Sequence, residues 1–165
     1  MRFILVLALS VLLAACSTSD QSGAGTTGAS TSGAGADVTQ APRGPAPGTQ
    51  AHLNQTIGDR VFFDTDRHNL DGEAQQTVQA WAQWLRENPN VSVLIEGHAD
   101  ERGTRDYNLA LGARRSFEVK SALQAMGING SRIETTTFGK ERPAVVGSNP
   151  AAWAQNRRAV MVVQG

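Results

Sequence analysis

The chain has 165 residues, with 15 basic and 15 acidic side chains, a formal net charge of zero and a single cysteine. No basic stripe with interleaved aromatic residues is present, which excludes the electrostatic pattern of a nucleic-acid-binding protein. A lone cysteine excludes internal disulfides, so packing alone must hold any folded domain together.

The first residues have the pattern of an export signal. Arg2 supplies a positive charge, and residues 3–13 are apolar or small apart from Ser10. This run is about half of the roughly 20 residues that span a bilayer, which predicts a signal peptide over residues 1–15. It ends in Leu13-Ala14-Ala15-Cys16, which resembles a bacterial lipobox. The alternative is an ordinary cleaved signal that leaves a free thiol.

The lipobox resemblance implies a diacylglycerol on the Cys16 sulfur and an acyl chain such as palmitate on the new amino terminus. Stable anchoring needs two or more acyl chains, so this modification predicts a permanently membrane-held protein. Ser17 stands where an aspartate would signal inner-membrane retention in enterobacteria. We therefore expect the outer membrane, with the folded part facing the periplasm. No other cofactor is expected.

Residues 17–50 are dominated by Ser, Thr, Gly, Ala and Pro, and Val38 is their only large aliphatic residue. Such a segment cannot bury enough apolar surface to offset the entropy lost on ordering, so it is predicted to be a disordered tether. The remaining residues 51–165 have the size of one ordinary domain.

Apolar periodicity in residues 51–165 predicts an α/β sandwich with two helices packed on one mixed sheet, in the order β-α-β-α-β-β. Val91, Val93 and Ile95 alternate with less apolar residues as in a strand. The other expected elements are strands over 60–63, 133–138 and 159–163, a helix capped by Asp71 that ends near Asn88, a helix capped by Thr104 or Asp106 that ends at Met126-Gly127, and a short helical turn opened by Asn149-Pro150.

The most informative stretch is Gly97-His98-Ala99-Asp100-Glu101-Arg102-Gly103-Thr104. It follows a predicted strand and opens a predicted helix, where backbone N–H groups and the helix dipole favour an anion. Within that helix, Arg115 falls on the apolar stripe and needs anionic or carbonyl partners. It either contributes to a ligand pocket with Asp100 or makes a structural ion pair with Asp100, Asp66 or Glu96. The third alternative is a snorkelling side chain, which lies at the edge of the apolar stripe with its charged end in water.

The stretch GHADERGTRDYNLALGARRSFEV is similar to the OmpA-like peptidoglycan-binding domain family. The likeness extends over nearly all of residues 55–163 and includes Val61-Phe62-Phe63-Asp64, residues 138–143 and residues 153–158. The resemblance implies a non-catalytic domain that binds peptidoglycan through the meso-diaminopimelate of its peptide stem. It also implies membership of the Tol-Pal envelope system, with TolB as a partner and roles in envelope integrity and cell division.

The same resemblance assigns the binding residues. Asp100 takes the ammonium of the ligand and Arg115 takes its carboxylate. The other implied site residues are Asp66, the loop residues Glu101, Arg102 and Thr104 through their backbone groups, and Asn108 and Leu111, which shape the wall. One departure from the family pattern is Thr65, where relatives often carry phenylalanine. We expect Asp100→Ala and Arg115→Ala to abolish retention on peptidoglycan while the fold stays largely intact.

Two alternatives remain open from the sequence. His98, Asp100 and Glu101 have the residue types of a metal-dependent hydrolase centre, although no HExxH pattern is present. A pure protein-docking module would instead use exposed charges such as Arg102, Arg105 and the Lys140-Glu141-Arg142 loop.

Overall fold

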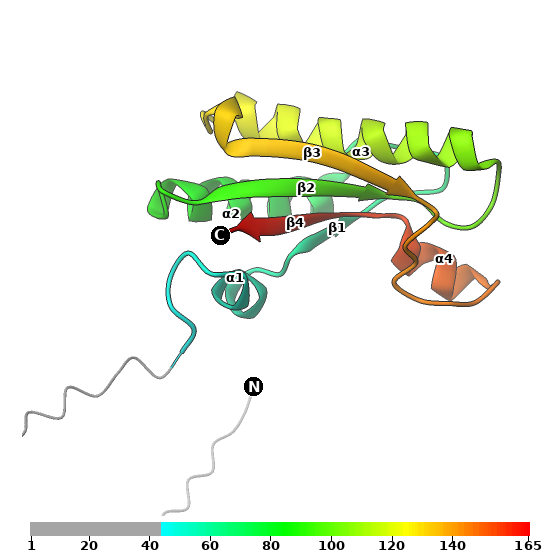
Figure 1. Cartoon of the computed structure of the whole chain (residues 1–165), viewed down its shortest axis with the longest axis horizontal. Helices are drawn as coiled ribbons and strands as arrows, with labels where there is room; N and C mark the ends of the chain where they lie inside the picture. Colours follow the sequence, from blue (N-terminus) through cyan, green and yellow to red (C-terminus); the bar gives the residue numbers. More distant parts are fainter. Residues whose placement is uncertain (1–43) are drawn as a thin grey trace, which may run out of the picture. The chain divides into compact units, whose positions relative to one another are not determined.

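A computed structural model describes residues 44–165, and the elements expected from the sequence are present in it (Figure 1). The signal peptide, Cys16 and most of the predicted tether lie outside the described residues. In chain order the elements are α1 (Gln50–Thr56), β1 (Arg60–Phe62), α2 (Gly72–Glu87), β2 (Ser92–His98), α3 (Arg105–Ala125), the short 3-10 helix η1 (Gly130–Arg132), β3 (Ile133–Gly139), α4 (Pro150–Asn156) and β4 (Arg158–Gln164).

The four strands form one mixed sheet in the order β1-β4-β2-β3. β2 runs parallel to β3, whereas β4 is antiparallel to both β1 and β2. The predicted sandwich of helices on a mixed sheet is therefore confirmed. Within residues 44–165, none of the helices is long and apolar enough to cross a bilayer.

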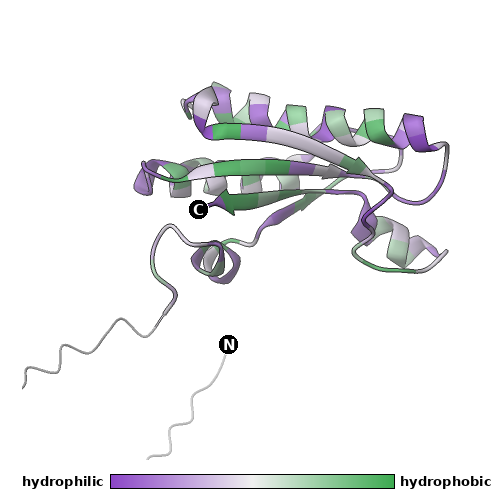
Figure 2. Ribbon diagram, in the orientation of Figure 1, coloured by the Kyte–Doolittle hydropathy of each residue, from purple (hydrophilic) through white to green (hydrophobic). Residues whose placement is uncertain are grey.

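The core lies between the sheet and the two long helices. Val93, Ile95 and Met161 of the sheet form one buried cluster with Trp81 of α2 and Val119 of α3. Figure 2 shows the corresponding apolar colouring along β2 and β4, and the alternation of apolar and polar residues on the helices. This alternation explains why periodicity was sufficient to predict α2. The buried face of α3 also contains Asn108, Arg115 and Ser116, so the prediction of α3 depended more on its cap at Thr104 and on Gly127.

Helix α1 was not predicted. It begins at Gln50, one residue before the expected start of the domain at residue 51. The side chain of Gln50 donates to the carbonyl of Met161 at 3.2 Å and accepts from the backbone N–H of Val163 at 2.7 Å. Leu53 is the only buried residue among the seven of α1, so the helix carries no periodic signal.

A pair of glycines lets α3 approach β2 closely. A Cβ atom built on Gly97 would lie 1.9 Å from the carbonyl oxygen of Gly112, which is fixed in the α3 backbone. Because both positions lack side chains, the middle of α3 rests directly on the end of β2. Arg115, one turn further along α3, thereby reaches the carbonyl of His98 at the end of β2 and two carbonyls of the loop after β1.

We predict that Gly97→Ala lowers the free energy of unfolding by about 1–3 kcal/mol, because the new methyl group must push α3 away from β2. Gly72→Ala is the matched control, since no atom lies within 4 Å of a Cβ at that first position of α2. Urea unfolding of the purified proteins measures both. Equal unfolding midpoints for Gly97→Ala and the wild type would contradict the close contact.

Candidate functional site

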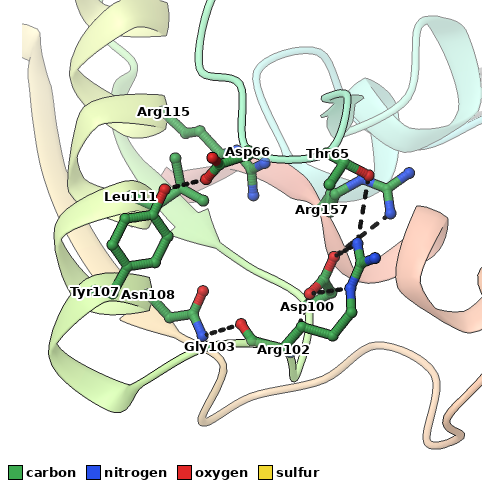
Figure 3. A pocket seen from close by; sticks show the side chains of 10 residues that line it. All are labelled: Thr65, Asp66, Asp100, Arg102, Gly103, Tyr107, Asn108, Leu111, Arg115 and Arg157. Carbon is green, nitrogen blue, oxygen red and sulfur yellow. Dashed lines mark hydrogen bonds and ion pairs between the residues drawn. The ribbon is translucent and has the colours of Figure 1, made fainter.

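A cavity of about 260 Å³ lies at the carboxyl end of β2. The loop after β1, the loop after β2, the first half of α3 and the junction between α4 and β4 all contribute to its wall (Figure 3). The lining residues are Thr65, Asp66, Asp100, Arg102, Gly103, Tyr107, Asn108, Leu111, Arg115 and Arg157.

Six of the eight ligand-binding residues named from the sequence line this cavity: Asp66, Asp100, Arg102, Asn108, Leu111 and Arg115. The side chains of the other two have different partners. The carboxylate of Glu101 accepts a hydrogen bond from Trp153 Nε1 at 3.0 Å. The hydroxyl of Thr104 caps α3 by accepting from the backbone N–H of Tyr107 at 3.3 Å.

Four lining residues are outside that set: Thr65 and Gly103, which the sequence had already placed beside the site, and Tyr107 and Arg157, which it had not. Tyr107 could have been found, because it precedes Leu111 and Arg115 at steps of four and so shares their helix face. Arg157 precedes β4, whose first residues pair with the end of β2 and with β1. That neighbourhood depends on the strand order, which the sequence alone did not provide.

Arg115 is fully buried and is held by three backbone carbonyls. Nε donates to Arg67 O at 2.9 Å, Nη1 to His98 O at 2.8 Å, and Nη2 to Asp64 O at 3.1 Å. No carboxylate lies within ion-pair distance of it among the described residues. The predicted structural ion pair is therefore wrong, and carbonyl groups fill that role.

A guanidinium has five N–H donors, so the three bonds of Arg115 leave two for a ligand. Burial, and then the positive charge of Arg157, lower the pKa of Arg115 to about 10. The group still carries its charge at neutral pH. Truncation by Arg115→Ala would leave three carbonyls without their donor, so the expectation that this variant keeps its fold intact is corrected.

Asp100 lies opposite, and its carboxylate already has several donors. Arg102 donates from Nε to Oδ1 at 3.1 Å and from Nη2 to Oδ2 at 2.7 Å. The backbone N–H of Arg102 bonds Oδ1 at 3.1 Å, and Nη1 of Arg157 lies 3.5 Å from Oδ2. Burial raises the pKa of Asp100, but the hydrogen bonds and charge of Arg102 outweigh it and hold the pKa below its usual range.

Asp66 and Asn108 complete the polar part of the wall. The hydroxyl of Tyr107 donates to the carboxylate of Asp66, and this bond raises the pKa of Tyr107. Asp66 has a φ of 61°, a left-handed conformation that aspartate tolerates better than most residues. Asn108 donates to the carbonyl of Arg102 at 2.8 Å and so fixes the loop to α3.

The cavity therefore contains two carboxylates, from Asp66 and Asp100, and three guanidinium groups, from Arg102, Arg115 and Arg157. Carboxylates accept hydrogen bonds from a cation, and guanidinium groups donate to an anion. With groups of both signs around one small cavity, the arrangement is suited to a ligand that carries an ammonium and a carboxylate close together.

The side chains proposed for a metal hydrolase do not converge. The ring of His98 is buried 5.5 Å from the ring of Phe138, whereas Glu101 bonds Trp153 and Asp100 bonds Arg102. Across residues 44–165, no group of three or more His, Cys, Asp or Glu side chains is placed to hold a metal ion. His98 contributes to the site through its carbonyl, which binds Arg115.

The model of the OmpA family matches residues 62–157, which is more than half of the chain. The chain belongs to the OmpA family. Among its relatives in this family, the peptidoglycan-associated lipoprotein of Agrobacterium fabrum is 50% identical over 119 residues, which cover 72% of this chain and 67% of the relative. The predicted resemblance is thus confirmed.

Solved structures with a similar fold are also known. The crystal structure of the peptidoglycan-associated lipoprotein from Burkholderia pseudomallei matches with a TM-score of 0.63 at 42% identity, over 64% of this chain and 90% of that one. The cell wall anchor of the T6SS from Pseudomonas aeruginosa matches with a TM-score of 0.53 at 25% identity, over 63% and 80% of the two chains.

We predict that acid destabilises the fold through His98. Burial, and then the charges of Arg158 and Arg142, lower the pKa of His98 from 6.5 to about 4. Between these values the unfolded chain binds a proton that the folded chain does not. The stabilisation is therefore complete above about pH 6.5 and falls towards pH 4, by up to about 1.4 kcal/mol per pH unit.

Urea unfolding of the wild type, His98→Asn and His68→Asn at about pH 7 and about pH 5 measures this contribution. His98→Asn should lose less stability on acidification than the wild type, whereas exposed His68 serves as the control and should leave the loss unchanged. The same loss in all three proteins would contradict the prediction.

Proposed function

We propose that this chain is a non-catalytic lipoprotein that binds peptidoglycan through the meso-diaminopimelate of the peptide stem and so ties the outer membrane to the cell wall. The observation that carries the proposal is the cavity with carboxylates and guanidinium groups around one small space. The end of a diaminopimelate side chain bears an ammonium and a carboxylate on the same carbon, which is the ligand chemistry that such a cavity suits. The names of the relatives, peptidoglycan-associated lipoproteins, support the same ligand.

In the proposed complex, the ligand carboxylate binds the two N–H groups that Arg115 does not give to carbonyls. A guanidinium donates two parallel hydrogen bonds to a carboxylate, which fixes orientation as well as position. The ligand ammonium binds Asp100, whose low pKa keeps it ionised at neutral pH. Asp66, Asn108 and Leu111 form the wall beside these two contacts.

The contacts support weak binding of a single stem. Charged hydrogen bonds contribute roughly 1.5–3 kcal/mol net each, and three or four of them must offset the entropy lost on association. The result is a dissociation constant in about the micromolar range or weaker. A membrane-held protein that faces a polymer with many stems needs no tighter site, because many weak contacts act together.

The membrane side of the proposal rests on the lipobox and on the family. We propose that Cys16 carries two or three acyl chains, which hold the protein at the outer membrane with the domain in the periplasm. Membership of the Tol-Pal system, with TolB as a partner, follows from the resemblance to the family. A role in envelope integrity and cell division belongs to the same proposal.

We predict that Asp100→Asn reduces binding to purified sacculi at least about tenfold, because the ammonium loses its charged acceptor. Co-sedimentation of the protein with sacculi measures binding, and free meso-diaminopimelate should compete with the wild type. Glu134→Gln is the matched control, because this exposed carboxylate of β3 does not line the cavity.

Sacculi in which lysine replaces meso-diaminopimelate provide a second test, since they lack the carboxylate of the zwitterion. They should retain much less of the wild-type protein. If Asp100→Asn binds as the wild type does, or if both kinds of sacculi bind equally, the assignment of the cavity to diaminopimelate is wrong.

We predict that Cys16→Ala moves the protein from the membrane fraction to the soluble periplasmic fraction, because the sulfur that carries the diacylglycerol is absent. Fractionation of cells, followed by immunoblotting, measures the distribution. A variant that stays in the membrane fraction would rule out Cys16 as the anchor.

A further inference from the structure

The carboxylate of Asp100 has no acceptor position left for a ligand in this structure. A carboxylate offers about four lone-pair positions, two on each oxygen. Oδ1 accepts from the backbone N–H and the Nε of Arg102, both at 3.1 Å. Oδ2 accepts from Arg102 Nη2 at 2.7 Å and from Arg157 Nη1 at 3.5 Å. An incoming ammonium can therefore bond Asp100 only after one of these donors has left.

Of these donors, the Arg102 side chain is the least restrained. The backbone N–H of Arg102 is fixed by the loop, which Asn108 ties to α3. Arg157 is only 15% exposed in its side chain, and its Nε donates to Phe63 O at 2.9 Å. The side chain of Arg102 is 41% exposed, and its other hydrogen bond is to the exposed hydroxyl of Thr65 at 3.3 Å. Only the Arg102 end of this pair reaches solvent, so its guanidinium can turn away from buried Asp100 and stay hydrated.

The Arg102 guanidinium lies over an aromatic ring at the same time as it pairs with Asp100. Its central carbon lies 4.3 Å from the centroid of the Trp153 ring, within the range of a cation–π contact. The indole is held in turn by its hydrogen bond to the exposed carboxylate of Glu101. A guanidinium that leaves Asp100 therefore stays over an aromatic face, next to a carboxylate of the same loop.

We propose that Arg102 is an internal competitor for the ammonium position: it occupies Asp100 in the free protein, and the ammonium of the ligand displaces it towards Trp153 and Glu101. This inference rests on the proposed function of the cavity and changes the role assigned to Arg102 from the sequence. Binding is then an exchange of one cation for another on Asp100, which lowers the affinity for a single stem.

The exchange also gives selectivity. A ligand with a carboxylate but no ammonium can reach Arg115 but has no group with which to replace Arg102 on Asp100. The ion pair of Arg102 and Asp100 then remains in place, and half of the site stays closed to that ligand. Zwitterionic ends of the stem are thereby favoured over other carboxylates in the envelope.

The test compares the binding of free meso-diaminopimelate to the wild type, Arg102→Gln and Arg105→Gln by calorimetric titration. Arg102→Gln should bind about two- to fivefold tighter, because the competing cation is gone and the ligand keeps its other contacts. Arg105→Gln is the matched control and should bind as the wild type does: Arg105 is 64% exposed, pairs with Glu141 and does not line the cavity. Arg102→Lys, which keeps the charge but loses the two-bond geometry, should give an intermediate affinity and serves if Arg102→Gln fails to fold.

Pimelate, which has both carboxylates and no amine, is the second probe. Its affinity should not rise in Arg102→Gln, since it does not compete with Arg102 for Asp100. Unchanged or weaker diaminopimelate binding by Arg102→Gln, or an equal gain for pimelate, would overturn the inference and leave the proposed function standing. A folded wild-type protein that binds neither sacculi nor diaminopimelate would overturn both.

Discussion

The buried guanidinium of Arg115 is the constraint on which the site depends. It joins three segments that are distant in the sequence, because its three carbonyl partners belong to Asp64 and Arg67 after β1 and to His98 at the end of β2. A buried cation is costly without such partners, so the loops cannot move away from α3 without losing them. The same bonds orient the remaining N–H groups. In the proposed complex, the Arg115 side chain therefore both stabilises the fold and binds the ligand.

The rest of the cavity follows the same pattern, in which each charged group is already bonded within the protein. Asp100 is satisfied by Arg102 and Arg157, and Asp66 by Tyr107. These bonds set the positions of the groups before any ligand arrives, so little ordering entropy is lost on binding. A ligand must also replace some of these internal contacts, so it gains only the difference in free energy between the new contacts and the old ones. For the proposed ligand, this arrangement predicts weak and reversible binding.

The sequence predicted the strands and long helices because their buried faces repeat with a clear period, as in β2 and α2. It could not predict α1, where Leu53 alone is buried and the contact of Gln50 with β4 spans more than a hundred residues. At the site, residue types and the family pattern led to six lining residues. Two features depend on strand order and on the paths of the loops, which no residue pattern specifies. They are the backbone carbonyls that hold Arg115 and the position of Arg157 in the cavity wall. The side chains of Glu101 and Thr104 have partners elsewhere, so only backbone groups of this loop segment could take the role that the family pattern implies for them.

The position of Gln50 has a mechanical consequence. Its side chain joins α1 to Met161 and Val163 of β4, which pair with Ile95 and Val93 of β2, whereas the cavity lies beyond the last residue of that strand. In a protein held at its N-terminus and at the cavity, tension would pass along the backbone from α1 through β1 to the loop that lines the cavity with Thr65 and Asp66. The two bonds of Gln50 to β4 and the antiparallel ladder between β1 and β4 would resist this pull together.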